Sequence, residues 1–125
     1  KINQILRNCH NYGYNIICGE NVFFNINCVV LDENKVNIGS NVFLGPGVQL
    51  YTASHPLDAM TRRTHKISKS LTISDDCWIG GNSIILPGIT IGKGCVIGAG
   101  SVVTKNIPDN SVAVGNPAKV IKKLN

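Results

Sequence analysis

One histidine is the first candidate for acid–base chemistry in this chain. His55 lies in the stretch 51–58, which reads YTASHPLD. A neutral imidazole, with an ordinary pKa of about 6.5, can take a proton from a hydroxyl group at pH 7. A surface histidine beside a proline turn would read the same way. The residue type alone therefore leaves both interpretations open.

Asn25 and Asp58 are the next polar candidates. Asn25 directly follows Phe24, whose place in the repeat described below predicts an inward side chain, so the Asn25 amide is expected to point outward. A simple turn asparagine is the alternative. Asp58 could orient a base or bind a substrate, and it could equally be a solvated loop charge.

The elements that must position these residues are set by a six-residue repeat. An aliphatic residue recurs every six positions at Ile73, Ile79, Ile85, Ile91, Ile97 and Val103. Small or aliphatic residues follow four positions after each of them, and glycine often follows directly, as at 80, 92 and 98. Such a period matches neither the 3.6 residues of an α-helix nor a simple alternating strand. It predicts a prism-like parallel β-helix in which each hexad gives one short strand and one turn. The aliphatic residue is expected to point inward, and the glycine or an Asn-Gly-type residue is expected to form the turn.

The first half of the chain obeys the same rule with two interruptions. Cys18, Phe24 and Val30 are six apart, and Ile38, Leu44 and Leu50 resume the series after a two-residue insertion. Seventeen extra residues, 56–72, then separate two hexads and predict a loop that leaves the helix. A short C-terminal tail is expected over about 112–125, so the whole chain, 1–125, is interpreted as a single all-β domain.

Three hexads would form one 18-residue coil, so positions 18 apart should stack about 4.8 Å from each other. Cys77 and Cys95 are such a pair. We expect two buried thiols here in preference to redox partners. Five cysteines without a CxxC spacing or a secretory segment favour reduced thiols in a cytoplasmic protein.

Five stretches together resemble the hexapeptide-repeat acyltransferases, and more narrowly their maltose and galactoside O-acetyltransferase branch. They read YGYNI at 12–16, NINC at 25–28, YTASHPLD at 51–58, WIGG at 78–81 and GNPAKVI at 115–121. The stretches run in family order over nearly the whole chain. The resemblance implies a left-handed β-helix, a homotrimer, and acetyl-CoA as co-substrate in grooves between neighbouring subunits, with no metal required.

The resemblance also implies a role for individual residues. His55 matches the base that activates the acceptor hydroxyl for direct attack, without an acyl-enzyme, and Asn25 matches an asparagine that binds the acceptor. Positions near the acyl donor are matched by Trp78, Gly81, Ala99, Thr104, Lys119 and Lys122. Gly81 lies in the stretch near the thioester, where a backbone N–H can stabilise the oxyanion. Ala99 and Thr104 match contacts to the pantetheine arm, and the two lysines match basic positions near the nucleotide phosphates.

One departure concerns the acceptor. Relatives usually carry a longer helical N-terminal segment with an acidic residue, whereas residues 1–11 contain neither Asp nor Glu. We therefore expect the N-terminal segment to be short or truncated. The acceptor stays open between a sugar hydroxyl, which the His-Pro-Leu-Asp stretch favours, and an amino sugar, serine or an antibiotic.

Composition bounds the remaining alternatives. The net charge is +5, but no basic run is interleaved with aromatic residues, which argues against a nucleic-acid surface. No apolar run approaches the roughly 20 residues of a membrane span. A zinc hydratase on the same fold would need three histidines brought together around the metal. The chain has only three, His10, His55 and His65, and two of them lie in irregular segments. A non-catalytic trimerisation module is the remaining alternative.

Overall fold

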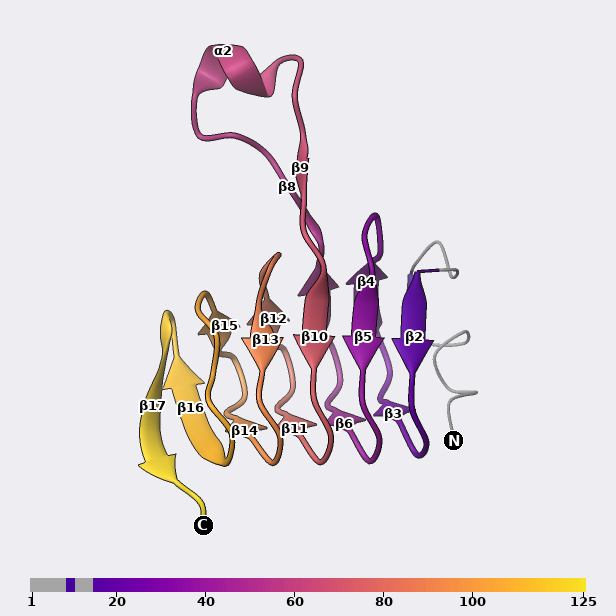
Figure 1. Ribbon diagram of the computed structural model, residues 1–125, viewed down its shortest axis with the longest axis vertical. Helices are drawn as coiled ribbons and strands as arrows, with labels where there is room; N and C mark the ends of the chain where they lie inside the picture. Colours follow the sequence, from indigo (N-terminus) through magenta and orange to yellow (C-terminus); the bar gives the residue numbers. More distant parts are fainter. Residues whose placement is uncertain (1–8, 11–14) are drawn as a thin grey trace.

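The computed structural model describes residues 9–10 and 15–125. Residues 15–125 wind into a parallel β-helix whose coils lie side by side along one axis (Figure 1). Sheet A contains β1 (Cys9–His10), β4 (Cys28–Leu31), β7 (Gln49–Tyr51), β12 (Ile84–Ile85) and β15 (Val102–Val103). Sheet B contains β2 (Ile16–Cys18), β5 (Val36–Ile38), β10 (Leu71–Ile73) and β13 (Thr90–Ile91). Sheet C contains β3 (Phe23–Phe24), β6 (Phe43–Leu44), β11 (Trp78–Ile79), β14 (Val96–Ile97), β16 (Ser111–Gly115) and β17 (Ala118–Lys123).

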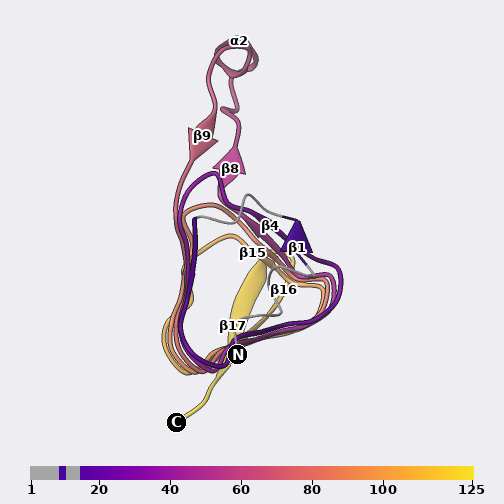
Figure 2. The same cartoon turned by 90° about the vertical axis from the view of Figure 1, so that its right-hand side faces the viewer.

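The six-residue repeat is confirmed as the basis of this fold. Along sheet C, the paired positions Phe24, Leu44, Ile79, Ile97 and Ala113 are all buried. The side chains between them face outward, because successive residues of a strand point to opposite faces. Figure 2 looks along the helix axis and shows the coils superimposed as a triangle. The core is the stack of aliphatic side chains inside that triangle.

Cys77 and Cys95 precede two paired strands, β11 and β14, and occupy equivalent positions in neighbouring coils. Both are buried, and both are free thiols. Their Sγ atoms lie 3.0 Å from the carbonyl oxygen of Gly92 and 3.1 Å from that of Pro108, respectively. Burial raises the pKa of the Cys77 thiol to about 12. The expected stacked, buried pair is confirmed.

The glycines of the repeat have a different role from the predicted one. The turns themselves use residues with positive φ, such as Asn82 (φ 60°) and Gly100 (φ 75°). Gly80, which directly follows the inward Ile79, is required for another reason. A Cβ there would lie 2.5 Å from the backbone nitrogen of Ala99 in the next coil. Glycine therefore permits two coils to approach at the corner of the triangle.

A hairpin leaves the helix between sheets A and B and projects from one corner (Figures 1 and 2). It consists of β8 (Ala53–Ser54), helix α2 (Ala59–Arg62) and β9 (Ile67–Ser68), with β8 and β9 antiparallel. The predicted limits, 56–72, therefore shift. Residues 53–54 already belong to the hairpin, and 71–73 already pair with β5 in the helix.

The C-terminal segment also differs from a simple tail. β16 continues sheet C beside β14, and Ala113 in its middle is buried. β17 then turns back antiparallel to β16 at the end of the helix. The segment predicted as a tail, 112–125, therefore begins inside the β-helix, because residues 111–113 still follow the coil register.

Candidate active site

His55 lies where the hairpin leaves the helix, one residue after β8. It lines a pocket of about 320 Å³ together with Thr104, which directly follows β15. Within residues 9–10 and 15–125, the imidazole has no hydrogen-bond or ion-pair partner, and the side chain is exposed. The structure thus brings the predicted base and one predicted donor-binding residue into the same pocket.

The other walls of this pocket come from the hairpin and from the same corner of the helix in a neighbouring coil. Lys69, which follows β9, lies across from Leu86 and Pro87, which follow β12. Sequence reasoning missed all three residues. Lys69 belongs to the segment that interrupts the repeat, where no periodicity marks it. Leu86 could have been found, because it occupies the position in its coil that Thr104 occupies in the next one.

Asp58 has a structural role in this conformation. Its carboxylate accepts hydrogen bonds from the backbone N–H of Thr61 at 2.9 Å and from the Thr61 hydroxyl at 2.7 Å. Asp58 is therefore the N-cap of α2. The backbone N–H of Thr61, followed by its hydroxyl, holds the pKa of Asp58 below its ordinary value. The predicted contact between Asp58 and an acceptor stays a prediction.

Asn25, Gly81 and Ala99 lie along a different edge, the corner between sheets C and A. The Asn25 N–H donates to Leu44 of the next coil at 3.0 Å, and the Gly80 N–H donates to Ile97 at 2.8 Å. Residues 25, 45, 80 and 98 are thus stacked along the corner, and residues 26, 46, 81 and 99 form the row beside them. The Asn25 Oδ1 accepts from the N–H of Ile26 at 2.7 Å, and its Nδ2 donates to no acceptor among residues 9–10 and 15–125.

The backbone of this second row differs from coil to coil. Residue 46 is proline and has no N–H, and the Gly115 N–H donates to the Ser101 hydroxyl at 3.1 Å. In the described part of the chain, the N–H groups of Gly81 and Ala99 donate to no protein acceptor. These two amides are available to an oxygen atom of a bound molecule.

Trp78 belongs to a row of aromatic side chains on the outer face of sheet C. Phe23, Phe43 and Trp78 are paired in register, and they are 43%, 54% and 56% exposed. The sequence pointed to Trp78 alone. The row could have been found from the repeat, since all three residues directly precede an inward position of sheet C.

Lys119 and Lys122 lie on β17, opposite Val114 and Val112 of β16, and both are exposed. β17 is joined to β16 through Gly115, whose position continues the row of Gly81 and Ala99. Lys119 thus lies just past the end of that row. The Lys119 ammonium at this end could bind an anionic group of a molecule that lies along the row of Gly81 and Ala99.

Four of the predicted site residues therefore fall on two different edges of sheet A. His55 and Thr104 lie at the corner with sheet B, and Gly81 and Ala99 lie at the corner with sheet C. Gly81 and Leu86 mark the two edges in one coil, on either side of β12, and a fully extended chain of that length spans about 17 Å. One chain does not bring all of these residues together.

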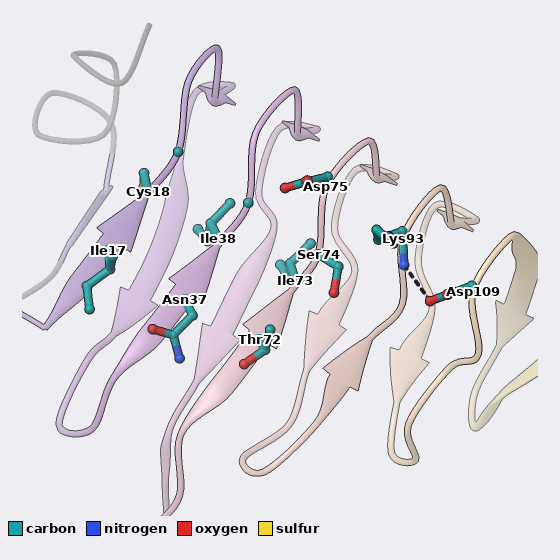
Figure 3. Close-up of a pocket in the computed structure, with 12 residues that line it drawn as sticks. Ile17, Cys18, Asn37, Ile38, Thr72, Ile73, Ser74, Asp75, Lys93 and Asp109 are labelled. Atoms are coloured by element: carbon teal, nitrogen blue, oxygen red, sulfur yellow. Dashed lines mark hydrogen bonds between the residues drawn. The ribbon is translucent and has the colours of Figure 1, made fainter.

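A larger hollow, of about 550 Å³, lies on the outer face of sheet B, and Figure 3 shows the residues around it. None of the predicted site residues lines it. Its two carboxylates accept backbone hydrogen bonds at the corner between sheets B and C. Asp75 Oδ1 accepts from the Ser40 N–H at 2.8 Å, and Asp109 Oδ1 accepts from the Lys93 N–H at 2.9 Å. We therefore assign this hollow to the shape of the repeat and not to the site.

Two further findings concern the described residues. No three or more His, Cys, Asp or Glu side chains among them are grouped as metal ligands. None of their helices is long and apolar enough to cross a membrane. The N-terminal expectations that concern residues 1–8 and 11, the match at 12–14 and the His10 side chain lie outside what the structure describes.

The sequence and fold were compared with those of known proteins. Residues 70–105 match the family described as bacterial transferase hexapeptide (six repeats). The galactoside O-acetyltransferase of Escherichia coli K12 is 44% identical over 91% of this chain and 57% of the relative. The crystal structure of a maltose O-acetyltransferase from Clostridium difficile 630 is 56% identical, with a TM-score of 0.92 over 95% of this chain and 65% of that one.

A hexapeptide-repeat-containing acetyltransferase from Vibrio cholerae is 41% identical, with a TM-score of 0.91 over 94% of this chain and 68% of that one. A structure of the Vibrio protein contains acetyl-CoA, and a structure of galactoside acetyltransferase contains coenzyme A. The chain spans 55–60% of the length of three curated relatives that are 51–53% identical to it. The match to these relatives identifies the β-helix as left-handed. The chain belongs to the hexapeptide-repeat acetyltransferases.

Proposed function

We propose that this protein transfers the acetyl group of acetyl-CoA to a hydroxyl group of a sugar or a related small acceptor, with His55 as the general base. The observation that carries the proposal is the pocket that His55 shares with Thr104. The sequence predicts that His55 activates the acceptor hydroxyl and that Thr104 contacts the acyl donor. The acetyl-CoA and coenzyme A complexes of proteins 41% and 43% identical to this one support the choice of donor.

The chemical step follows from a base beside a thioester. An imidazole nitrogen of His55 accepts the hydroxyl proton while the hydroxyl oxygen attacks the carbonyl carbon of the acetyl group. The tetrahedral intermediate then collapses, the carbon–sulfur bond breaks, and the sulfur leaves with the proton held by His55. The products are the acetyl ester and coenzyme A. No covalent acyl-enzyme is formed on the protein.

The negative oxygen of the intermediate needs a hydrogen-bond donor. The Gly81 N–H suits this role, because no acceptor among the described residues occupies it and glycine permits a close approach. Ala99 would contact the pantetheine arm one coil further on, and Lys119 and Lys122 would lie near the phosphates. Asn25, through its free Nδ2, would hold the acceptor.

We propose a homotrimer with acetyl-CoA between neighbouring subunits. His55 and the Gly81 N–H must act on the same carbonyl group, yet one chain holds them on two edges of sheet A. A neighbouring copy that presents its Gly81 edge to His55 would complete the site. The exposed row of Phe23, Phe43 and Trp78 beside that edge is the surface that such a neighbour would cover.

The direct test is the release of coenzyme A from acetyl-CoA over a panel of sugars, amino sugars, serine and aminoglycosides. We expect acceptor-dependent release, and a fall of roughly 10² or more in kcat for His55→Ala, since the base contributes about that factor. His65→Ala is the matched control, because His65 is an exposed histidine of the same hairpin whose Nδ1 contacts the Thr64 hydroxyl at 2.9 Å. Full activity of His55→Ala, or an equal loss in both variants, would refute the assignment of the base.

A further inference from the structure

Lys69 is the charged residue of the pocket around His55. We propose that Lys69 selects an acceptor that carries a negative charge, such as the carboxylate of an acidic sugar. This inference rests on the proposed function, because it concerns the acceptor of the same reaction.

The position of Lys69 is fixed by its neighbours. Its backbone N–H donates to the carbonyl oxygen of Thr52 at 2.9 Å, which ties the end of the hairpin to the helix. Its side-chain stem passes Gly88, where a Cβ would lie 3.1 Å from the Lys69 Cδ. The stem therefore packs against the segment that also supplies Leu86 and Pro87 to the pocket wall.

The pocket has an uncompensated positive charge. Its lining residues include one lysine and no carboxylate. Within residues 9–10 and 15–125, the Lys69 ammonium has no ion-pair partner, whereas the Lys66 ammonium lies 2.8 Å from the Glu33 carboxylate. An ammonium in such a pocket favours a bound anion.

The rest of the hairpin has the same sign of charge. Arg62 and Arg63 are exposed near its tip, and the carboxylate of Asp58 is engaged with Thr61. Basic residues on the hairpin raise the local concentration of anions near the molecule and so near the pocket. This attraction would act on both acetyl-CoA and an anionic acceptor. Only one of the two can bind the Lys69 ammonium inside the pocket.

The chemistry of the two substrates indicates that Lys69 contacts the acceptor and not the acyl donor. The acyl end of acetyl-CoA is a neutral thioester, and its phosphates are at the opposite end of the molecule. The acceptor, in contrast, must place its hydroxyl group against His55 to be deprotonated. A cation in the wall beside His55 therefore lies within reach of a substituent on the acceptor ring, and a carboxylate is the group that a lysine binds as a point charge.

The test compares two sugars that differ in one group. Galactose and galacturonic acid share their ring hydroxyls, but the second has a carboxylate in place of the CH₂OH group. We expect wild-type kcat/KM to be about fivefold or more higher for the acid, mainly through KM. Lys69→Met should reduce this ratio to near one, and the ratio is the readout because both sugars are compared on the same variant. Added salt should lower the ratio in the wild type.

Lys66→Met is the matched control, because it removes a cation of the same hairpin that already has a carboxylate partner. It should keep the wild-type preference. An unchanged ratio in Lys69→Met, or a wild-type preference for galactose, would overturn the inference and leave the proposed function intact. A rise in KM for acetyl-CoA with both sugars would also overturn it, since it would place Lys69 on the donor. Acetylation of no acceptor, neutral or acidic, would instead refute the proposed function.

Discussion

The coils of the β-helix and the hairpin at residues 53–68 are held together by different forces. In the coils, the inward side chains form a buried core, and Ile79 and Ile97 are 0% exposed. Helix α2 of the hairpin buries no residue, and Leu57 is 96% exposed. The hairpin is ordered instead by the Asp58 cap and by hydrogen bonds along β8 and β9.

The proposed chemistry is divided between these two regions. Gly81 and Ala99 belong to a corner whose position is fixed by the coils on both sides. His55 and Lys69 lie at the base of the hairpin, which packs on little of its own chain. The oxyanion donor is thus placed by the core, while the base belongs to a segment that a substrate or a neighbouring subunit can still adjust.

The largest effect that separates the two regions is expected from their apolar side chains. Ile91→Ala removes a fully buried side chain and should lower the free energy of unfolding by about 2–5 kcal/mol. Leu57→Ala removes an exposed one and should change it by less than about 0.5 kcal/mol. Denaturant unfolding monitored by circular dichroism measures both. A large loss for Leu57→Ala would mean that the hairpin packs against a second copy in solution.

A smaller effect is expected from the corner glycines. Gly92→Ala would place a Cβ 2.6 Å from the backbone nitrogen of Asp109, and backbone atoms cannot easily move aside. We expect a loss near 3 kcal/mol, at the upper end of the roughly 1–3 kcal/mol that overpacking costs.

Gly100→Ala is the control for this prediction. Gly100 has a φ of 75°, and a Cβ there would meet no atom within 4 Å. Only the strain of the left-handed backbone remains, which costs about 1 kcal/mol. The same unfolding measurement compares the two variants. A smaller loss for Gly92→Ala than for Gly100→Ala would contradict close approach as the reason for glycine after the inward residue.

How far the sequence predicts this molecule depends on the repeat. The series from Ile73 to Val103 predicts the inward positions, because a residue every six positions meets the same environment in a three-sided coil. The stacking of the free thiols of Cys77 and Cys95 in neighbouring coils follows from the same 18-residue spacing. The role of Gly80 does not, because the period shows where glycine recurs but not whether it is needed for a turn or for contact between coils.

The hairpin has no period, and predictions there depend on other signals. His55 was found through its motif, whereas Lys69 has none and became visible only when the fold placed it beside His55. The capping role of Asp58 could have been recognised, since Asp followed three residues later by Thr61 is a local hydrogen-bonding pattern. The hairpin begins a few residues before the expected limits of about 56–72, because antiparallel pairing of β8 with β9 recruits residues before Pro56.

The smallest expected effect concerns the hairpin alone, and it depends on pH. The Thr61 N–H bonds to the charged carboxylate of Asp58, which lowers the pKa of that group. The cap should therefore be fully present above pH 4, near the ordinary pKa of about 3.9, and should be lost as pH falls through the lowered value. Exchange protection and the chemical shift of the Thr61 amide, followed by NMR from pH 7 to pH 2, measure this local change.

Asp58→Asn sharpens the same test, because an asparagine oxygen caps a helix about as well as aspartate but does not titrate in this range. The variant should keep Thr61 protected at pH 7 and should show no transition on acidification, while amides of the coils, such as that of Gly80, stay protected in both proteins. An unchanged Thr61 amide in the wild type at pH 2 would mean that the carboxylate does not hold α2. The order of the hairpin would then have to come from its strands, whose backbone hydrogen bonds do not depend on pH.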